Sequence, residues 1–363
     1  MRRVTQLLGG LSLLAISAAF GGAPAKHQPP AVAGEFVFET APFASAHAST
    51  IAETGDGLVA AWFGGTRERA PDVGIWVSRR SEGRWSAPAE VANGVMPDGT
   101  RYACWNPVLF APSAGVLTLY YKIGPSPSEW WGMERSSRDS GRTWTAARRL
   151  PDGILGPIKN KPVRGPDGAI VAPSSTETTG RPSKWRVHFE RSTDNGATWI
   201  ASSPAAAAGA GEIDAIQPAI LVHPGGVLQA VGRSKSKRVF ETWSRDGGRT
   251  WTPLALTMLP NPDAGIDAVT LRDGRHLVVY NHSTDARAPL NVAISKDGKI
   301  WEAALVLERE PGEYSYPAVI QGHDGLIHVS YTWKRLRIKH VTIDPATLAG
   351  TVMADGKWPQ DRR

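Results

Sequence analysis

The chain has 363 residues but only one cysteine, Cys104, so an intramolecular disulfide is excluded and stability has to come from a packed core. The sequence also lacks a group of His, Cys and acidic residues at metal-ligand spacing, a glycine-rich phosphate loop and a serine-nucleophile turn. We therefore expect no metal and no cofactor. The 41 Lys and Arg residues are scattered among 34 acidic ones without a nucleic-acid-binding signature, so nucleic acid is not an expected partner.

Long apolar runs are absent except at the start of the chain. There, the charged segment Met1–Arg3 precedes an apolar stretch over residues 7–20 and the small residues Ala23–Ala25. This order predicts a signal peptide over residues 1–25, because the apolar stretch is shorter than the roughly 18 residues that a membrane-spanning helix needs. We expect an exported protein, periplasmic or extracellular, that has no membrane insertion once the signal is removed. Residues 26–40 are expected to form an N-terminal linker.

A short motif, Ser-x-Asp followed by Gly and ending in Trp, recurs along the chain. Complete copies begin at Ser137, Ser192 and Ser244, a shortened copy begins at Ser295, and a worn copy without its Asp begins at Ser78. The Trp residues that end these copies lie about 50 to 59 residues apart, at Trp85, Trp144, Trp199, Trp251 and Trp301. A period of this size is typical of propeller blades or of solenoid repeats.

The segments between the motifs are predicted to form strands. Residues 73–77, 116–121, 276–280 and 326–331 are rich in β-branched and aromatic residues. The 38 Gly and 28 Pro residues interrupt longer patterns, and no sustained helical periodicity follows the signal, so a helical solenoid is excluded. We predict an all-β, six-bladed β-propeller over residues 41–345, followed by a C-terminal tail over residues 346–363.

The repeated motif has a structural explanation. Its Asp carboxylate can accept N–H bonds within a turn, its Gly can adopt positive φ, and its Trp can pack between strands. We therefore expect its aspartates to stabilise blades rather than to contact substrate.

With these motifs at this spacing, the chain resembles the sialidase (neuraminidase) superfamily, and especially its BNR or Asp-box repeat members, over residues 40–342. The resemblance implies a sialidase-type propeller that acts on acidic glycans. It also implies three arginines that hold the substrate carboxylate, a Tyr nucleophile assisted by a Glu, and an Asp acid/base on a loop of the first blade.

Three elements of that pattern have counterparts in this sequence. Arg287 precedes an apolar strand that leads into the copy at Ser295, as the family's third arginine does. Arg233 ends the segment 225–233, which resembles the strand of the second arginine. Tyr314, with Tyr316 as a close rival, resembles the catalytic tyrosine.

Other positions depart from the family pattern. His47 stands where the first arginine is expected, and its intrinsic pKa suits proton transfer near neutrality. The loop 64–72 lies where the acid/base Asp belongs, so Glu68 or Asp72 is the candidate acid, and Arg67 or Arg69 could restore the missing positive charge.

The assisting Glu is also replaced. Gln217 occupies its place, and an amide can bind substrate but cannot act as a general base. Arg101 and Asn106, in a polar and aromatic segment over residues 101–107, are further candidates for substrate contact.

These residues leave three functional hypotheses open. The first is an exported, exo-acting, sialidase-like glycoside hydrolase that removes a terminal acidic sugar, either a sialic acid or a uronic acid. The second is a uronate-directed lyase, in which arginines neutralise the carboxylate and His47 or a tyrosine removes the adjacent proton. The third is a glycan-binding propeller without catalysis.

Overall fold

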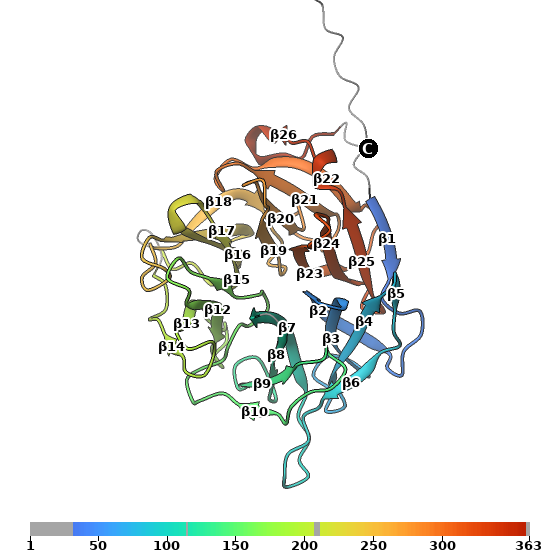
Figure 1. Cartoon of the computed structure of the whole chain (residues 1–363). Helices are drawn as coiled ribbons and strands as arrows, with labels where there is room; N and C mark the ends of the chain where they lie inside the picture. The colour runs from blue at the N-terminus through green and yellow to red at the C-terminus, as the bar shows by residue number, and fades with distance from the viewer. Residues whose placement is uncertain (1–31, 114, 207–210, 361–363) are drawn as a thin grey trace, which may run out of the picture.

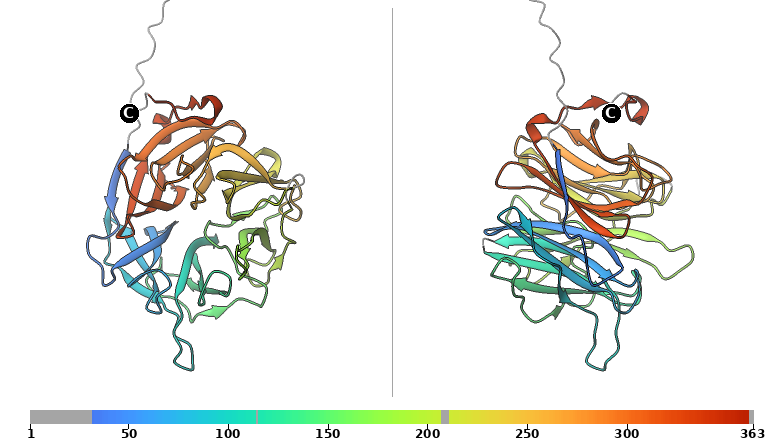
Figure 2. Two further views of the ribbon diagram at one scale, coloured as in Figure 1. Left: turned by 180° about the vertical axis from the view of Figure 1, so that it is seen from behind. Right: turned by 90° about the vertical axis from the view of Figure 1, so that its right-hand side faces the viewer.

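The computed structural model describes residues 32–113, 115–206 and 211–360; the expected signal peptide, residues 1–25, lies outside the described residues. The described chain forms six antiparallel sheets arranged around a central axis (Figure 1). Seen from behind, the sheets follow one another around the ring in chain order (Figure 2, left). The predicted all-β, six-bladed β-propeller is therefore confirmed. No helix in the described part of the chain is long and apolar enough to cross a membrane.

The first three blades follow the order of the chain, and each begins at the axis and ends at the periphery. Blade 1 contains β2 (Ser45–Thr54), β3 (Gly57–Gly65), β4 (Gly74–Ser81), β5 (Arg84–Trp85) and β6 (Ala89–Ala92). Blade 2 contains β7 (Cys104–Ser113), β8 (Val116–Ile123), β9 (Trp131–Ser137) and β10 (Arg148–Arg149). Blade 3 contains β11 (Val163–Arg164), β12 (Ile170–Glu177), β13 (Trp185–Ser192) and β14 (Ile200–Ala201).

The last three blades include both ends of the described chain. Blade 4 contains β15 (Ala215–Val222), the 3₁₀ turn η1 (Pro224–Gly226), β16 (Leu228–Ser234), β17 (Arg238–Ser244) and β18 (Ala255–Pro260). Blade 5 contains β19 (Asp267–Thr270), β20 (His276–Tyr280), β21 (Leu290–Ser295), β22 (Glu302–Glu308) and β26 (Thr351–Val352). Blade 6 contains β23 (Tyr314–Gln321), β24 (Ile327–Trp333), β25 (Arg337–Ile343) and β1 (Val32–Phe36). The turns η2 (Pro345–Thr347) and η3 (Ala354–Gly356) flank β26.

Two boundaries differ from those expected from the sequence. Residues 26–40, expected as a linker, contain β1, and residues 346–363, expected as a tail, contain β26. Both strands pair with the outer edge of a blade, β1 with β25 and β26 with β22. Neither segment carries the repeated motif, so the repeat pattern alone could not place them in the propeller.

The repeated motif forms the turn after the third strand of its blade. In the copy at Ser192, the Asp194 carboxylate accepts bonds from the Thr198 N–H at 2.9 Å and from its hydroxyl at 2.6 Å, while Ser192 Oγ accepts from the Gly196 N–H at 2.8 Å. These bonds also hold the pKa of Asp194 at about 2. The structure thus confirms the expected turn geometry.

The Trp that ends a motif packs on the preceding blade. The ring of Trp199 meets that of Tyr120 edge-on at 6.2 Å, and the ring of Trp251 stacks on that of Phe189 at 3.6 Å. Such aromatic pairs contribute about 0.5–1.5 kcal/mol beyond their burial. Each motif therefore stabilises a contact between two blades as well as its own turn.

The innermost strands of four blades carry a β-bulge that bends the chain near the axis. Register shifts occur in β2, β7, β15 and β23. Within them, residues with positive φ are Ala48 at 57°, Asn106 at 33°, Gln217 at 56° and Tyr316 at 51°. Residues other than Gly adopt this backbone conformation at a cost of roughly 1–3 kcal/mol, and such residues cluster at functional sites. A bulge redirects side chains that strict alternation would send elsewhere.

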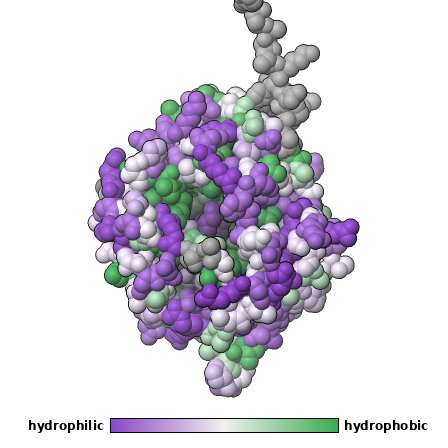
Figure 3. All heavy atoms as spheres, in the orientation of Figure 1, coloured by the Kyte–Doolittle hydropathy of each residue, from purple (hydrophilic) through white to green (hydrophobic). Residues whose placement is uncertain are grey.

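Packing between blades supplies most of the core. One cluster joins Phe63 and Ile75 of blade 1 with Leu119 and Tyr121 of blade 2, and all four side chains are buried. The face seen along the axis is hollowed near its centre, and most of the surface around the hollow is hydrophilic (Figure 3).

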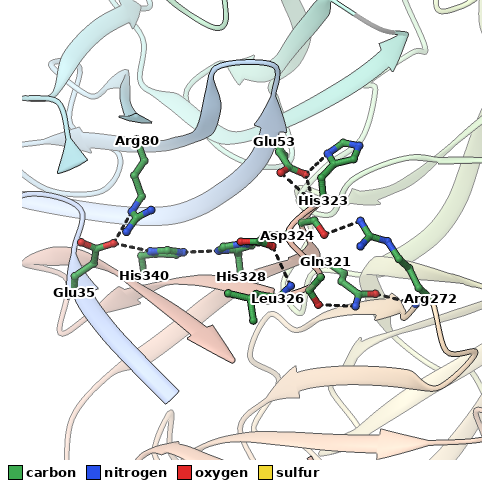
Figure 4. A network of polar contacts seen from close by, with 12 residues as sticks. Glu35, Glu53, Arg80, Arg272, Gln321, His323, Asp324, Leu326, His328 and His340 are labelled. Atoms are coloured by element: carbon green, nitrogen blue, oxygen red, sulfur yellow. Dashed lines mark hydrogen bonds and ion pairs between the residues drawn. The ribbon is translucent and has the colours of Figure 1, made fainter. Parts of the chain in front are cut away.

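The ring closes through the first and last parts of the chain, because β1 completes blade 6. At this junction the Glu35 carboxylate contacts Arg80 Nε of blade 1 at 2.8 Å and His340 Nδ1 of β25 at 3.1 Å. His340 Nε2 lies 3.1 Å from His328 Nδ1, and His328 Nε2 lies 3.2 Å from the Asp324 carboxylate (Figure 4). A continuous polar network thus links β1 to two blades.

Candidate functional site

A hollow of about 220 Å³ lies where the inner strands and their loops converge, and all six blades contribute to its wall. The residues that line it are His47, Glu68, Arg69, Trp105, Asn106, Pro127, Trp130, Glu177, Gln217, Arg233, Arg287, Tyr316 and Arg335. We call it the central pocket. None of the four motif aspartates lines it, in keeping with their place in peripheral turns.

Most of the candidate residues from the sequence meet in this pocket. The structure brings together His47, Glu68, Arg69, Asn106, Gln217, Arg233, Arg287 and Tyr316. They come from strands β2, β7, β15, β16 and β23 and from two loops. His47 and Tyr316 are 269 positions apart in the chain, yet their rings are neighbours, with centroids 4.4 Å apart.

Four of the candidates lie outside the pocket lining. Tyr314 is 1% exposed and packs among apolar residues between blades 5 and 6. The Asp72 carboxylate is bound by the Thr66 N–H at 2.8 Å and hydroxyl at 2.6 Å, bonds that lower its pKa despite partial burial. Arg67 and Arg101 are exposed outside the pocket, and Arg101 contacts the backbone oxygen of Asp72 at 3.4 Å.

The position of Tyr314 has a geometric cause. Residues two apart on a regular strand face the same way, so alternation would place Tyr314 and Tyr316 on one side. The bulge between Ser315 and Ala318, with positive φ at Tyr316, separates them. Tyr316 faces the pocket, and Tyr314 is left in the core.

Two guanidinium groups of the pocket share one half-buried acid, Glu313. Glu313 Oε1 accepts from Arg287 Nη1 at 2.9 Å and from Arg335 Nε at 2.8 Å, and it also accepts from the Ser315 hydroxyl at 3.0 Å. Burial alone would raise the pKa of Glu313, but the charges of Arg335 and Arg287 outweigh it and lower that pKa. Glu313 therefore stays ionised and fixes the direction of both arginines.

Arg335 also contacts a carboxylate inside the pocket. Its Nη1 lies 2.5 Å from Glu68 Oε2, and the side chains are 30% and 36% exposed. Arg335 belongs to the turn between β24 and β25, where its φ is 60°, and its backbone oxygen accepts from the Ala46 N–H at 2.9 Å. The hairpin is thus tied to β2, and Arg335 reaches the space beside His47.

The third guanidinium, that of Arg233, lies between two aromatic rings. Its Cζ is 5.0 Å from the centre of the Trp185 ring and 5.5 Å from that of Tyr316. Nη1 donates to the Asp263 backbone oxygen at 3.0 Å, while Nε is buried without a hydrogen-bond partner among the described residues. A buried cation with unused donors is suited to an anionic ligand, because charge-assisted hydrogen bonds are the stronger ones.

Tyr316 lies at the floor of the pocket between His47 and Gln217. The Gln217 amide nitrogen is 3.5 Å from Tyr316 Oη, and Gln217 Oε1 is buried without a partner in the described chain. An unpartnered buried acceptor costs roughly 1–3 kcal/mol. A ligand donor at this position would remove that cost.

His47 is fixed beneath the arginines. Its Nδ1 lies 3.0 Å from Thr332 Oγ1, and the residue is 2% exposed. Burial, followed by the charges of Arg335, Arg287 and Arg233, holds the pKa of His47 well below the ordinary 6.5. The imidazole is therefore neutral near pH 7 and can accept a hydrogen bond.

A buried lysine lies below Tyr316. Lys159 Nζ donates to the backbone oxygens of Ile266 at 2.8 Å and Pro317 at 2.5 Å and to Asn160 Oδ1 at 2.8 Å. Burial lowers the pKa of Lys159 to about 7. Its Nζ lies 5.7 Å from the centre of the Tyr316 ring, so Lys159 supports the floor of the pocket.

Glu177, at the end of β12, contributes a second carboxyl group. Its Oε2 accepts from Trp185 Nε1 at 3.1 Å, and within the described residues it makes no ion pair. Burial raises the pKa of Glu177, and the charge of Arg233 only partly opposes this effect. The pocket thus holds one carboxylate paired with an arginine, Glu68, and one that is unpaired.

Sequence reasoning did not find Arg335 or its partner Glu313. Arg335 belongs to none of the motifs, and its only signal is the basic turn Lys334–Arg337 after a predicted strand. Among the described residues, no group of His, Cys, Asp and Glu is arranged to hold a metal ion.

A family model described as BNR repeat-like domain matches residues 56–329. No curated protein matches the chain. Its structure is similar to that of a Dyadobacter fermentans protein of unknown function, with a TM-score of 0.71 and 18% identity over 86% of this chain and 99% of that one.

Solved sialidases share the fold. The Hadza microbial sialidase Hz136 has a TM-score of 0.70 and 18% identity, over 84% of this chain and 66% of that one. The NanB sialidase of Streptococcus pneumoniae has a TM-score of 0.68 and 12% identity, over 89% and 71%. At these identities the likeness shows a common six-bladed propeller. Because the family model covers most of the chain, this propeller belongs to the BNR repeat-like domain family and is a sialidase-like BNR-repeat protein.

Proposed function

We propose that the protein is an exo-acting glycoside hydrolase that removes a terminal acidic sugar from a glycan. The observation that carries this proposal is the convergence of Arg233, Arg287 and Arg335 around Tyr316 in one central pocket. Guanidinium groups bind planar carboxylates with two parallel hydrogen bonds, so this cluster is suited to the carboxylate of an acidic sugar. The N-terminal sequence pattern adds the proposal that the protein acts after export, in the periplasm or outside the cell.

In this proposal Tyr316 is the nucleophile, and its hydroxyl attacks the anomeric carbon. The Tyr316 proton passes to a base, for which neutral His47 is the candidate because Gln217 cannot accept it. Glu68 lies on the loop of blade 1 where the resemblance places the acid/base. It gives a proton to the departing glycosidic oxygen, and water then releases the sugar from Tyr316.

Binding of substrate changes the contacts of Glu68. In the free protein Glu68 is paired with Arg335. When the substrate carboxylate binds Arg335, this pair is exchanged and Glu68 is free to turn towards the glycosidic oxygen. The ion pair therefore links recognition of the carboxylate to the position of the proposed acid.

A second reaction is favoured by two specific observations. Gln217 replaces the expected Glu, and a neutral His47 lies beside Tyr316 under three arginines. In an elimination, the arginines stabilise the charge that develops on a uronate carboxylate while His47 or Tyr316 removes the neighbouring proton.

The test is to incubate the mature protein with sialosides and with uronic-acid oligosaccharides and to identify the products by mass spectrometry. A free sugar with the mass of added water supports hydrolysis, and an unsaturated uronate supports elimination. Binding without products supports a non-catalytic glycan-binding protein instead.

Arginine variants test the proposed carboxylate site. We expect Arg233→Ala, Arg287→Ala and Arg335→Ala each to weaken binding of the acidic sugar by at least roughly tenfold. Arg101→Ala is the matched control, because Arg101 is exposed outside the pocket. If the pocket variants bind the acidic sugar as tightly as the control does, the carboxylate assignment fails.

A further inference from the structure

The central pocket has two unlike sides. Arg287 and Arg335 come from blades 5 and 6 and share Glu313, whereas Gln217 comes from blade 4 and Glu177 from blade 3. Arg233, also of blade 4, lies between these two sides. If the arginines hold the carboxylate of an acidic sugar, the rest of the ring extends towards Gln217 and Glu177. These residues then decide which sugar fits.

Two hydrogen-bond acceptors are available to such a ring. Gln217 is 2% exposed, and its Oε1 has no partner in the described chain. Glu177 uses one carboxyl oxygen to accept from Trp185 Nε1, while its other oxygen makes no hydrogen bond within the described residues. Both groups therefore need donors, and sugar hydroxyl groups are donors of this kind.

The position of Glu177 is fixed rather than free. Trp185, which binds its carboxyl group, has its own backbone N–H held by Asp214 Oδ1 at 2.8 Å. The Trp185 ring also packs against the guanidinium of Arg233. The distance between Arg233 and Glu177 is therefore fixed by neighbouring strands of blades 3 and 4, through Trp185. A fixed distance between two binding groups is what discrimination between sugars requires.

The size of the pocket limits the ligand further. At about 220 Å³ the hollow is smaller than the roughly 300–1,000 Å³ of usual small-molecule sites. A six-carbon uronic acid consists of one ring, one carboxylate and hydroxyl groups. A nine-carbon sialic acid adds a glycerol chain and an acetamido methyl group, and the lining is mainly charged and polar rather than apolar.

We propose that Gln217 and Glu177 form a hydroxyl-binding wall that selects a hexuronic acid as the terminal sugar. This inference rests on the proposed function for the carboxylate site and adds the substrate class. The arginines bind the carboxylate of the uronic acid, and the wall, on blades 3 and 4, accepts hydrogen bonds from the ring hydroxyl groups.

The experiment compares aryl glycosides of glucuronic, galacturonic and N-acetylneuraminic acid in both anomeric forms where they exist. We expect at least one hexuronide to be cleaved with a kcat/KM at least roughly tenfold above that of the sialoside. Binding of the three free acids, measured by calorimetry, provides a second readout that does not depend on catalysis.

Variants at Glu177 test the wall itself. Glu177→Gln keeps an acceptor for Trp185 Nε1 and serves to show that the fold is intact. Glu177→Ala removes both the contact with Trp185 and the proposed contact with the sugar hydroxyl. We expect Glu177→Ala to raise KM for the hexuronide, or the dissociation constant of the free uronic acid, by roughly tenfold and to change kcat less. Deoxy analogues of the uronic acid provide the decisive comparison, because the analogue that lacks the bound hydroxyl should be insensitive to the substitution. Glu212→Gln, at an exposed ion pair with Lys184, is the control.

The outcomes separate this inference from the proposed function. Preference for the sialoside, in cleavage or in binding, overturns the hexuronate assignment and leaves the carboxylate site standing. Absence of cleavage with every glycoside contradicts the proposed hydrolase, and calorimetry with the free acids still decides the substrate class. Equal binding of uronic acid by wild type and Glu177→Ala overturns the hydroxyl-binding wall.

Discussion

The stability of the ring should depend on pH through His340, which lies at the junction of β1 and blade 6. Burial lowers the pKa of His340 to about 4, and the hydrogen bond with Glu35 opposes this shift only in part. His328, Arg80 and Asp324 complete the titratable and charged surroundings of the pair (Figure 4).

The direction and size of the effect follow from proton linkage. An unfolded His binds protons with a pKa near 6.5, so between pH 6.5 and about 4 the unfolded chain binds more protons at this position than the folded one does. The contribution of His340 to stability is therefore complete above pH 6.5 and is lost as the pH falls towards 4. At pH 5 the loss amounts to about 2 kcal/mol of the free energy of unfolding.

The assay is urea unfolding at pH 7.5 and pH 5.0, followed by tryptophan fluorescence. His340→Gln removes the titrating group but keeps a polar side chain, so the difference between the two pH values should shrink by about 2 kcal/mol relative to wild type. His323→Gln is the control, because the His323 side chain is 91% exposed and surface ion pairs contribute little. An unchanged pH dependence in His340→Gln would refute the reasoning.

Three further predictions concern the pocket and the blades. Tyr316→Phe should lower turnover of an acidic glycoside by roughly 10²-fold or more, whereas Tyr314→Phe, in the core, should leave it nearly unchanged; comparable losses in both would contradict the assignment. Glu68→Gln should slow turnover but bind the free sugar acid up to about fivefold more tightly, because the ion pair between Glu68 and Arg335 no longer competes with the sugar carboxylate. Kinetics should therefore show a lower kcat while calorimetry shows a lower dissociation constant. Asp194→Ala should lower the melting temperature by a few degrees without changing KM, since its carboxylate binds only its own turn; a change in KM would show that the turn influences the pocket.

The fold could be predicted because its signal is local. Each complete copy of the motif contains the Ser, Asp and Gly that form one turn, so a short segment such as Ser192–Trp199 is sufficient to identify a blade. The strand β1 carries no such signal, because its partner β25 lies at the other end of the chain. Pairing across the whole sequence cannot be inferred from composition or from a repeat.

The candidate site was only partly predictable for a related reason. Arg233 and Arg287 precede copies of the motif, so the repeat gives their place, and both lie in the pocket. The choice between Tyr314 and Tyr316 depends on a bulge that alternation does not predict. Arg335 enters the pocket from a hairpin turn and lies on the same pocket wall as His47, which is a relation in space and not in sequence.

The closure of the ring by β1 has a consequence for how the molecule is made. Glu35 and His340 are 305 positions apart, so the strand synthesised first has to wait for a partner that is synthesised almost last. Once β25 has been made, it presents an unpaired edge until β1 docks on it, and such an edge is the kind that recruits other chains. A chain shortened at its N-terminus would therefore fail by association with its neighbours, even if every other blade had formed.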